Sequence, residues 1–480
     1  MPKFSEIYNI NKPQPLLDFV DIDIELDTPL YIDPSALAAR TDSWSMVSLH
    51  QVNTFFQAVL ASIYANDREK CLQLLSYLGE PEETHLGFSK GTNKGRGVGK
   101  KQAEDIYNAL SQSKASKTGL LKDISDLALF IPKLGRDKVS DMTTNIIRYN
   151  LIKYTQQQCL LYNIPMEDVP SGMYWSINGM RWTQEHVELP VNNGSKILLV
   201  PKYTVRRQVV VDHTSFRKKY VLGFLQEEHA KAGNTLVTAI KGVKEEEVKK
   251  IYKKDLDKEC PKGKSFLTEF SIQHPEIINK YRNSLKIKAT PVPNINGDDF
   301  DESKLADDLK KELASIPAGS HDANTYHNHC ISIISFIFFP NLIYPKKEDE
   351  VNEGRKRIDI TYFNGKEEGL FRSISLDSSI KANVIHVECK NYTKDIKNPE
   401  LDQLLARFDR NRGKFGMLLF RNSIDMNKLK ARCRDAAKQG NGIALPIDDA
   451  FLIECLELIS KGKRVEIDKI TTTLFREIIS

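Results

Sequence analysis

Apolar and polar residues alternate in a short stretch of the C-terminal third of the chain, and this alternation predicts a β-strand. Residues 384–392 read VIHVECKNY. In an extended strand, successive side chains point to opposite faces of the sheet. One face carries Ile385, Val387 and Cys389, and the other carries Val384, His386, Glu388 and Lys390. We therefore expect the first face to pack in a core and the second to carry a functional site.

The same pattern predicts a run of elements around this strand. They are a helix at 321–338, strands at 341–345 and 355–364, the strand at 384–392, a helix at 399–411, a strand at 414–421, a basic helix at 426–438, a strand at 442–447 and a helix at 448–460. This order predicts an α/β (α+β) domain in which helices flank a mixed sheet. Residues 286–303 are rich in Pro, Asn, Gly and acidic residues and predict a linker. We therefore divide the chain into an N-terminal region (1–285), the linker (286–303) and a C-terminal domain (304–480).

The N-terminal region predicts a mixed α/β structure of unassigned fold. Strict alternation at 19–27 (FVDIDIELD) favours a half-exposed strand that carries Asp21, Asp23 and Glu25 on its polar face. Further strands are expected within 196–212. Helices are expected at 47–78, 100–113, 140–162, 215–232 and 244–257, with Ser140 as an N-cap.

Composition narrows the class of protein. A chain of 480 residues, 40% hydrophobic and 28% charged, is typical of a globular protein with two or three cores. No apolar run reaches the ~20 residues of a membrane helix, and no signal peptide pattern opens the chain, so we expect a cytoplasmic protein that does not interact with membranes. The seven cysteines are dispersed without a CxxC pair, which argues against zinc modules and a disulfide framework.

Glu388, Cys389 and Lys390 form a triplet in which an acidic residue and a lysine are two positions apart. Triplets of this kind occur by chance elsewhere in this chain, but this one lies at the end of an apolar strand. The preceding strand contains Asp359 between Ile358 and Ile360, so two neighbouring strands offer two carboxylates and an ammonium group. Carboxylates supply the oxygen ligands that Mg²⁺ prefers, and a metal-activated water suits phosphodiester hydrolysis. The structural alternative is a salt bridge between Lys390 and either carboxylate.

These residues and the helix and strand order around them resemble the restriction-endonuclease-like, or PD-(D/E)xK, nuclease superfamily over residues 320–425. The resemblance implies that Asp359 and Glu388 bind Mg²⁺ or Mn²⁺, that Lys390 assists hydrolysis and that Gln403 lies near the site. This sequence has Ile358 where the family pattern has proline, and Arg407 where some subfamilies have tyrosine. It also lacks the first-helix glutamate of many relatives, for which Glu348 or Glu353 would substitute.

A basic segment follows the motif. Residues 390–438 contain thirteen lysines and arginines against six carboxylates. Such an excess attracts an anionic partner, and counterion release would make its binding to nucleic acid salt-dependent. The residues that we expect to contact DNA phosphates are Arg407, Arg410, Arg412, Lys414, Lys428, Lys430, Arg432 and Arg434.

Two further motifs have plain structural alternatives. Residues 87–102 (GFSKGTNKGRGVGKKQ) lack the spacing of a Walker A loop, and both a phosphate-contacting loop and a solvated loop stay open. Residues 327–329 spell HNH within a predicted helix, where consecutive side chains point in different directions, so these histidines are expected to be partly buried polar residues.

The resemblance implies a Mg²⁺-dependent endonuclease that cleaves DNA in restriction or defence against phage. Fusions of this kind use the other region for recognition or regulation, so a homodimer or larger oligomer and a regulatory partner protein are compatible with it. Two alternatives remain: a nucleic-acid-binding or assembly protein that retains the fold without catalysis, and a nuclease for RNA or single strands.

Overall fold

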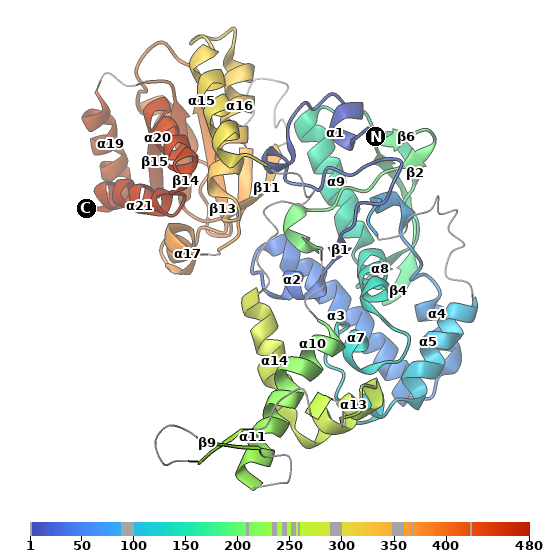
Figure 1. Cartoon of the computed structure of the whole chain (residues 1–480). Coiled ribbons are helices and arrows are strands. Elements are labelled where there is room, and N and C mark those ends of the chain that lie inside the picture. Colours follow the sequence, from blue (N-terminus) through green and yellow to red (C-terminus); the bar gives the residue numbers. More distant parts are fainter. Residues whose placement is uncertain are drawn as a thin grey trace.

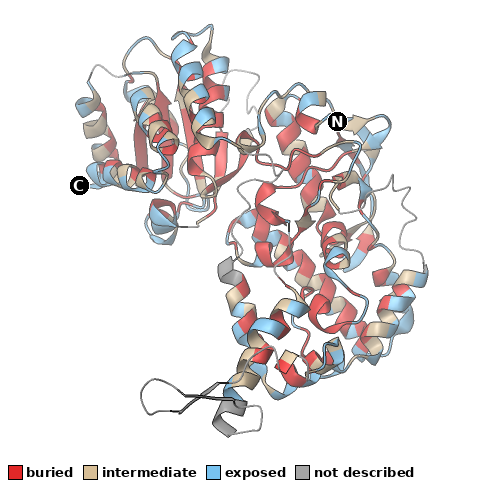
Figure 2. Ribbon diagram, viewed as in Figure 1, coloured by how far each residue is buried: buried red, intermediate tan, exposed pale blue. Residues whose placement is uncertain are grey.

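The computed structural model describes residues 2–87, 100–207, 211–232, 238–241, 247–250, 256–257, 260–288, 300–347, 360–366, 368–422 and 425–480. Its buried residues form two large hydrophobic clusters. One contains mainly residues of the N-terminal region, from Phe4 to Leu285, and the other mainly residues of the C-terminal domain, up to Ile478. Figure 1 shows the C-terminal domain in yellow to red beside the larger N-terminal region, and Figure 2 shows that its sheet is buried between helices.

The C-terminal domain is built on a five-stranded mixed sheet. The strands, in spatial and sequence order, are β11 (Leu342–Lys347), β12 (Ile360–Asn364), β13 (Val384–Lys390), β14 (Phe415–Phe420) and β15 (Ile443–Asp448). β11, β12 and β13 pair antiparallel, whereas β13, β14 and β15 pair parallel. The expected mixed sheet is thus confirmed, with β13 at its centre.

Helices cover this sheet on both sides. They are α15 (Glu302–Ser315), α16 (Ala323–Phe338), α17 (Gly369–Leu376), α18 (Asn398–Leu405), α19 (Met426–Lys438), α20 (Asp449–Ser460) and α21 (Glu466–Ile479). The predicted helices at 321–338, 426–438 and 448–460 are confirmed, and the one at 399–411 ends early, at Leu405. The sequence did not predict α15, α17 or α21.

The N-terminal region is mainly helical. Its α-helices are α1 (Phe4–Ile7), α2 (Pro34–Ala38), α3 (Ser43–Tyr64), α4 (Arg68–Leu75), α5 (Lys100–Gln112), α6 (Lys114–Lys117), α7 (Asp126–Phe130), α8 (Arg136–Ile146), α9 (Arg148–Tyr162), α10 (His213–Phe216), α11 (Leu222–Ala232), α13 (Lys264–Gln273) and α14 (Pro275–Lys288). Short antiparallel pairs join β1 (Tyr31–Ile32) with β8 (Val205–Arg206), β2 (Glu167–Pro170) with β5 (His186–Leu189), β3 (Tyr174–Ser176) with β4 (Arg181–Thr183), β6 (Val191–Asn192) with β7 (Ser195–Lys196), and β9 (Thr238–Lys241) with β10 (Glu247–Lys250).

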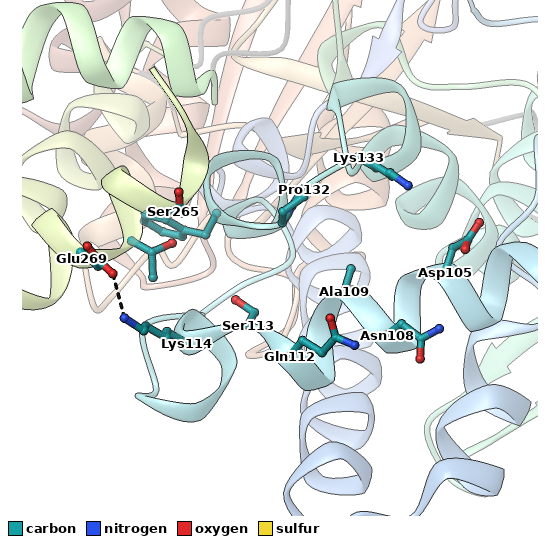
Figure 3. Close-up of a pocket in the computed structure, with 12 residues that line it drawn as sticks. Asp105, Asn108, Ala109, Gln112, Ser113, Lys114, Pro132, Lys133, Ser265 and Glu269 are labelled. Carbon is teal, nitrogen blue, oxygen red and sulfur yellow. Dashed lines mark hydrogen bonds and ion pairs between the residues drawn. The ribbon is translucent and has the colours of Figure 1, made fainter. Parts of the chain in front are cut away.

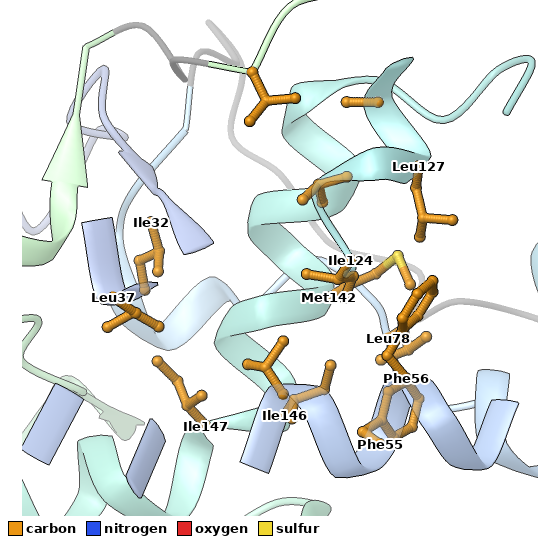
Figure 4. Packing of buried hydrophobic residues seen from close by; sticks show 14 of the residues in the cluster. Ile32, Leu37, Phe55, Phe56, Leu78, Ile124, Leu127, Met142, Ile146 and Ile147 are labelled. Atoms are coloured by element: carbon orange, nitrogen blue, oxygen red, sulfur yellow. The ribbon is translucent and has the colours of Figure 1, made fainter. Parts of the chain in front are cut away.

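The core of this region forms where α3 and α8 meet. Phe55 and Phe56 of α3 pack near Met142 and Ile146 of α8, and the cluster extends to Leu127 of α7 (Figure 4). The β3–β4 hairpin adds Trp175 and Trp182, whose rings lie 6.0 Å apart against Phe55. These tryptophans are core residues, as a small packed hairpin requires.

The expected strand at 19–27 is wrong. Residues 19–27 form only isolated bridges, and Phe19, Val20, Asp21 and Ile22 are all buried. Asp21 is buried because its carboxylate accepts hydrogen bonds from the backbone N–H and hydroxyl of Ser5. The alternation of apolar and acidic residues therefore reflects a buried carboxylate with local partners, not the exposed face of a strand.

Other N-terminal predictions need correction for similar reasons. Residues 140–162 form two helices, and Ser140 lies inside α8, where its hydroxyl accepts a hydrogen bond from the N–H of Ile32. Of the strands expected within 196–212, the structure describes the short strand β8, whereas Ile197 to Val200 are buried without regular structure; residues 208–210 lie outside the described part. Within 244–257 the structure describes strand β10 instead of the expected long helix.

The two regions share a buried junction at β11. Ile343 and Tyr344 belong to the N-terminal core, whereas Leu16 and Leu161 belong to the C-terminal one. Tyr344 has a φ of +52° at a register shift between β11 and β12. The division at 286–303 stays a prediction: α14 ends at Lys288, α15 begins at Glu302, and residues 289–299 lie outside the described part.

Asp18 lies at the centre of this junction. Its carboxylate accepts a hydrogen bond of 2.8 Å from the Tyr154 hydroxyl and one of 3.0 Å from the Tyr344 N–H. Burial raises the pKa of Asp18 although the Lys202 ammonium and these hydrogen bonds oppose the shift. Gln158 of α9 also donates to the Pro345 carbonyl. The N-terminal region thus holds the edge strand of the C-terminal sheet through polar contacts that are buried.

In the part of the chain that the structure describes, no helix has the combined length and apolar character needed to cross a bilayer.

Candidate active site

Strand β13 brings Glu388 and Lys390 to one face of the sheet, near its end. Both side chains are buried, with exposed fractions of 1% and 2%. In the parallel register with β14, Glu388 lies opposite Leu418 and Lys390 opposite Phe420. The two faces of β13 are separated as expected. However, the face that carries Glu388 and Lys390 is buried, whereas an open active site would be exposed to solvent.

Two cations contact the carboxylate of Glu388. The Lys390 ammonium forms an ion pair with Oε1, and Nη2 of Arg407 lies 3.9 Å from Oε2. Neither oxygen accepts a well-aligned hydrogen bond from the described residues. The contacts of Glu388 are therefore ion pairs, and its carboxylate keeps unused capacity as a ligand.

Helix α18 covers this face and supplies the third predicted residue. Gln403 Oε1 accepts a hydrogen bond of 3.1 Å from the Lys390 ammonium. The helix lies close to β14 because Gly416 has no side chain: a Cβ there would lie 2.9 Å from Leu404 Cδ1. A side chain at 416 would require Leu404 to change its conformation, so this glycine permits the close packing of α18 on β14.

The residue after the motif holds the neighbouring loop in place. Asn391 is buried, and its amide donates to the carbonyls of Pro317 and Gly319, while its own backbone carbonyl accepts from the Gly319 N–H. The sequence prediction assigned no role to Asn391. Its position directly after Lys390 was the only available signal, because the partners are about 70 residues away in the chain.

Cys389 does not take part in the site, although it lies between Glu388 and Lys390 in the sequence. A hydrogen bond with the Cys330 thiol of α16, together with burial, raises the pKa of Cys389. Tyr362 of β12 also reaches α16, where it donates to the Ile331 carbonyl. Helix α16 thus covers the face opposite to Glu388, and Cys389 is a protonated packing residue there.

Three predicted acidic residues lie outside the described part of the chain: Asp359, Glu348 and Glu353. The described end of β12 is Ile360, which pairs with Val387. In the sequence Asp359 directly precedes Ile360, as Glu388 directly follows Val387. The role of Asp359 as the second carboxylate of the site therefore stays a prediction.

The eight basic residues expected on DNA fall into two groups. Five have contacts within the protein: Arg407 with Glu388 (3.9 Å), Arg412 with Asp409 (3.7 Å), Lys414 with the Gly440 carbonyl (3.0 Å), Lys430 with Glu477 (2.7 Å) and Arg432 with the Ile396 carbonyl (3.1 Å). Arg410 and Lys428 are exposed, and Arg434 is half-buried on α19. The second group is better placed to contact a phosphate backbone.

We expect replacement of Arg410, Lys428 and Arg434 by glutamine to lower the salt dependence of DNA binding. Each phosphate contact releases about one counterion, so the slope of log affinity against log salt should flatten by roughly three. Fluorescence anisotropy with a labelled duplex between low and high salt measures this slope. The matched control replaces three other exposed lysines, Lys461, Lys463 and Lys469, which lie between the end of α20 and the first turns of α21; an equal change there would assign the effect to net charge alone.

The HNH residues are structural, as expected from their place in a helix. His329 is buried, its Nε2 lies 2.8 Å from the Leu309 carbonyl, and burial lowers its pKa, so the neutral ring donates to that carbonyl. His327 is also buried in α16. Within the described residues no group of three or more His, Cys, Asp or Glu side chains is arranged to bind a metal.

A separate cavity of about 440 Å³ lies in the N-terminal region, between α5 and α13. Figure 3 shows Asp105, Asn108 and Gln112 of α5 along one side, with Lys133 near Asp105. At the other end Lys114 and Glu269 form an ion pair of 2.7 Å. The cavity contains no residue of the β13 site.

The comparisons with known proteins concern the N-terminal region alone. Residues 9–212 match a family model described as a domain of unknown function (DUF8370). No curated protein and no solved structure matches the chain. The matched range ends before α10, so it contains Asp18 and most of the N-terminal core but none of the residues around Glu388.

Proposed function

We propose that this protein is a metal-dependent endonuclease that hydrolyses phosphodiester bonds of DNA, in restriction or defence against phage. The observation that supports the proposal is the convergence of Glu388, Lys390, Gln403 and Arg407 on one face of the central strand of a mixed sheet. A carboxylate can hold a divalent metal, and an ammonium group and a guanidinium can stabilise negative charge on a phosphate during metal-assisted hydrolysis.

The topology of the sheet supports a restriction-endonuclease-like fold. Three antiparallel strands, β11 to β13, are followed by a crossover through α18 to the parallel strand β14, and the site residues lie on β13 and on that crossover helix. Apart from α17, which lies between β12 and β13, this matches the α-β-β-β-α-β order that the sequence predicts. Fold alone does not determine function, so the proposal depends on the side chains.

The residues present fit a divalent metal. The two buried oxygens of Glu388 accept no aligned hydrogen bond from the described residues, and a buried carboxylate of this kind is a ready ligand. Glu388 and Asp359 would hold Mg²⁺ or Mn²⁺, which would activate water and neutralise charge on the phosphate. Lys390, oriented by Gln403, would stabilise negative charge that develops on the phosphate oxygens.

Burial of the site bears on its control. With Glu388 and Lys390 only 1% and 2% exposed, a phosphodiester reaches them only after neighbouring residues move. A nuclease whose active site stays closed until it meets its target would not cut the DNA of its own cell. The N-terminal region, a second copy of the chain or a regulatory partner protein would supply the signal to open it.

A second function is favoured by the same burial. A closed ion pair between Lys390 and Glu388 is also what a nucleic-acid-binding or assembly protein without catalysis would retain. In that case the basic surface would bind nucleic acid and the ion pair would serve only the fold. The two functions differ in whether binding is followed by a metal-dependent cut.

We expect the purified full chain to cut supercoiled plasmid or linear duplex DNA with Mg²⁺ or Mn²⁺ and to leave both intact with EDTA. The measurement is gel analysis of plasmid, linear duplex, single-stranded DNA and RNA under each condition. Cutting of RNA or of single strands alone would change the substrate class. Binding of all substrates without a metal-dependent cut would support the non-catalytic function and overturn the proposal.

A further inference from the structure

Arg407 occupies a different place from the DNA surface that its sequence context predicted. It follows α18, its side chain is 14% exposed, and its guanidinium faces Oε2 of Glu388. Lys390 faces the other oxygen, Oε1, and is also bound by Gln403. One buried carboxylate is thus shared by two cations, each on a different oxygen.

The two cations differ in burial and in distance from the carboxylate. Lys390 is 2% exposed, lies in a strand and also donates to Gln403. Arg407 is 14% exposed, lies after the end of a helix and approaches Glu388 to 3.9 Å. Of the two oxygens of Glu388, Oε2 is therefore the one whose facing cation is more exposed and farther away.

The charges explain why a cation faces Oε2 at all. A buried carboxylate is costly unless it is paired, and two cations on one carboxylate exceed what a simple ion pair needs. A positive charge near Oε2 also opposes the approach of a divalent cation to the same oxygen. Arg407 and a metal therefore compete for one position.

We propose that Arg407 is a positioning residue that neutralises Oε2 of Glu388 in the metal-free protein and competes with the divalent metal for that oxygen. This inference rests on the proposed function, because it requires that Glu388 be a metal ligand. Once displaced, the guanidinium is next to the site and adds to the cations available for a phosphate group, to which arginine binds with two parallel hydrogen bonds. Arg407 thus couples metal binding to substrate binding.

The test is Mn²⁺ binding to the full chain, measured by the loss of the free-ion electron paramagnetic resonance signal, without nucleic acid. Arg407→Gln removes the charge and keeps a shorter polar side chain, and Arg407→Ala removes nearly the whole side chain. We expect both variants to bind Mn²⁺ roughly tenfold more tightly than the wild type, because a unit charge about 4 Å from the carboxylate is lost. The control is Arg372→Gln, an exposed arginine of α17, which should bind Mn²⁺ as the wild type does.

The outcomes separate this inference from the proposed function. Equal Mn²⁺ affinity in the wild type, Arg407→Gln and Arg407→Ala would overturn the role of Arg407. Loss of the site in folded Glu388→Gln, as judged by circular dichroism, would at the same time uphold Glu388 as a ligand. Unchanged Mn²⁺ binding in Glu388→Gln would instead overturn the metal site and both proposals with it.

Discussion

Glu388→Gln is expected to abolish Mg²⁺-dependent cleavage of DNA by the full chain, with a loss of at least about a thousandfold in rate. Glutamine has nearly the same shape but no charge, so it cannot replace a carboxylate as a metal ligand. The change also removes the anion with which the buried Lys390 is paired, which should lower the free energy of unfolding by about 3–5 kcal/mol. A loss of activity alone would therefore not separate chemistry from stability.

The double variant Glu388→Gln with Lys390→Met makes this separation. It removes both members of the ion pair, and replacing both partners is usually far less destabilising than removing one. We expect part of the lost stability to return while cleavage stays absent. If Glu388 and Lys390 served only the fold, cleavage would return together with stability, as measured by chemical denaturation and plasmid cutting on the same samples.

Two exposed residues next to the site provide matched controls. Asp402 lies on α18 beside Gln403, and Lys394 follows β13 by four residues. Asp402→Asn and Lys394→Gln remove the same kinds of charge without a contact to Glu388, so they should leave the cleavage rate within about twofold of the wild type, the size of an ordinary surface change. Full cleavage by Glu388→Gln would show that the site lies elsewhere.

The sequence predicted the C-terminal domain better than the N-terminal region, and the reason is physical. Strands β13, β14 and β15 are buried segments with turn residues on both sides, and such segments have few alternatives to a sheet. Residues 19–22 and 197–200 are also rich in apolar residues, but they are buried as irregular segments, and the Asp21 carboxylate among them finds its partner in Ser5. A local pattern cannot distinguish these two ways of burying a chain.

The sequence predicted that Glu388, Lys390 and Gln403 lie together, but it did not predict their burial or the ion pairs around them. Glu388, Lys390 and Gln403 lie in contact, as the motif suggested. The pattern could not show that they are buried, nor that Arg407 faces Glu388 and Lys430 faces Glu477. Pairing of a charged side chain depends on residues from other elements, so a count of basic residues overstates the surface that is available to DNA.

The junction at Asp18 offers a route by which the N-terminal region can control the site. Asp18 holds the N–H of Tyr344 in β11, and β11 pairs with β12 up to the pair Lys347 and Ile360. Ile360 in turn pairs with Val387, the residue before Glu388. A change at Asp18 is thus connected to the site through three neighbouring strands of one sheet.

Asp18→Ala is expected to lower the free energy of unfolding by about 3 kcal/mol or more, because it leaves the Tyr154 hydroxyl and the Tyr344 N–H buried without an acceptor, at about 1–3 kcal/mol each. Asp18→Asn keeps one acceptor oxygen and should cost less. Beyond this loss of stability, we expect cleavage to change in rate or in its dependence on the target, since the edge strand is no longer fixed. The measurements are chemical denaturation and the cleavage rate with Mg²⁺ on identical duplex DNA.

Asp21→Ala is the control that separates coupling from stability. Asp21 is also buried in the N-terminal region and accepts two hydrogen bonds, both from Ser5, but it does not contact β11. It should therefore lose a similar amount of stability and, under conditions in which both variants remain folded, cut DNA at the wild-type rate. If Asp18→Ala and Asp21→Ala cut equally well, the N-terminal region does not act on the site through β11, and its control of cleavage must operate through DNA binding or assembly instead.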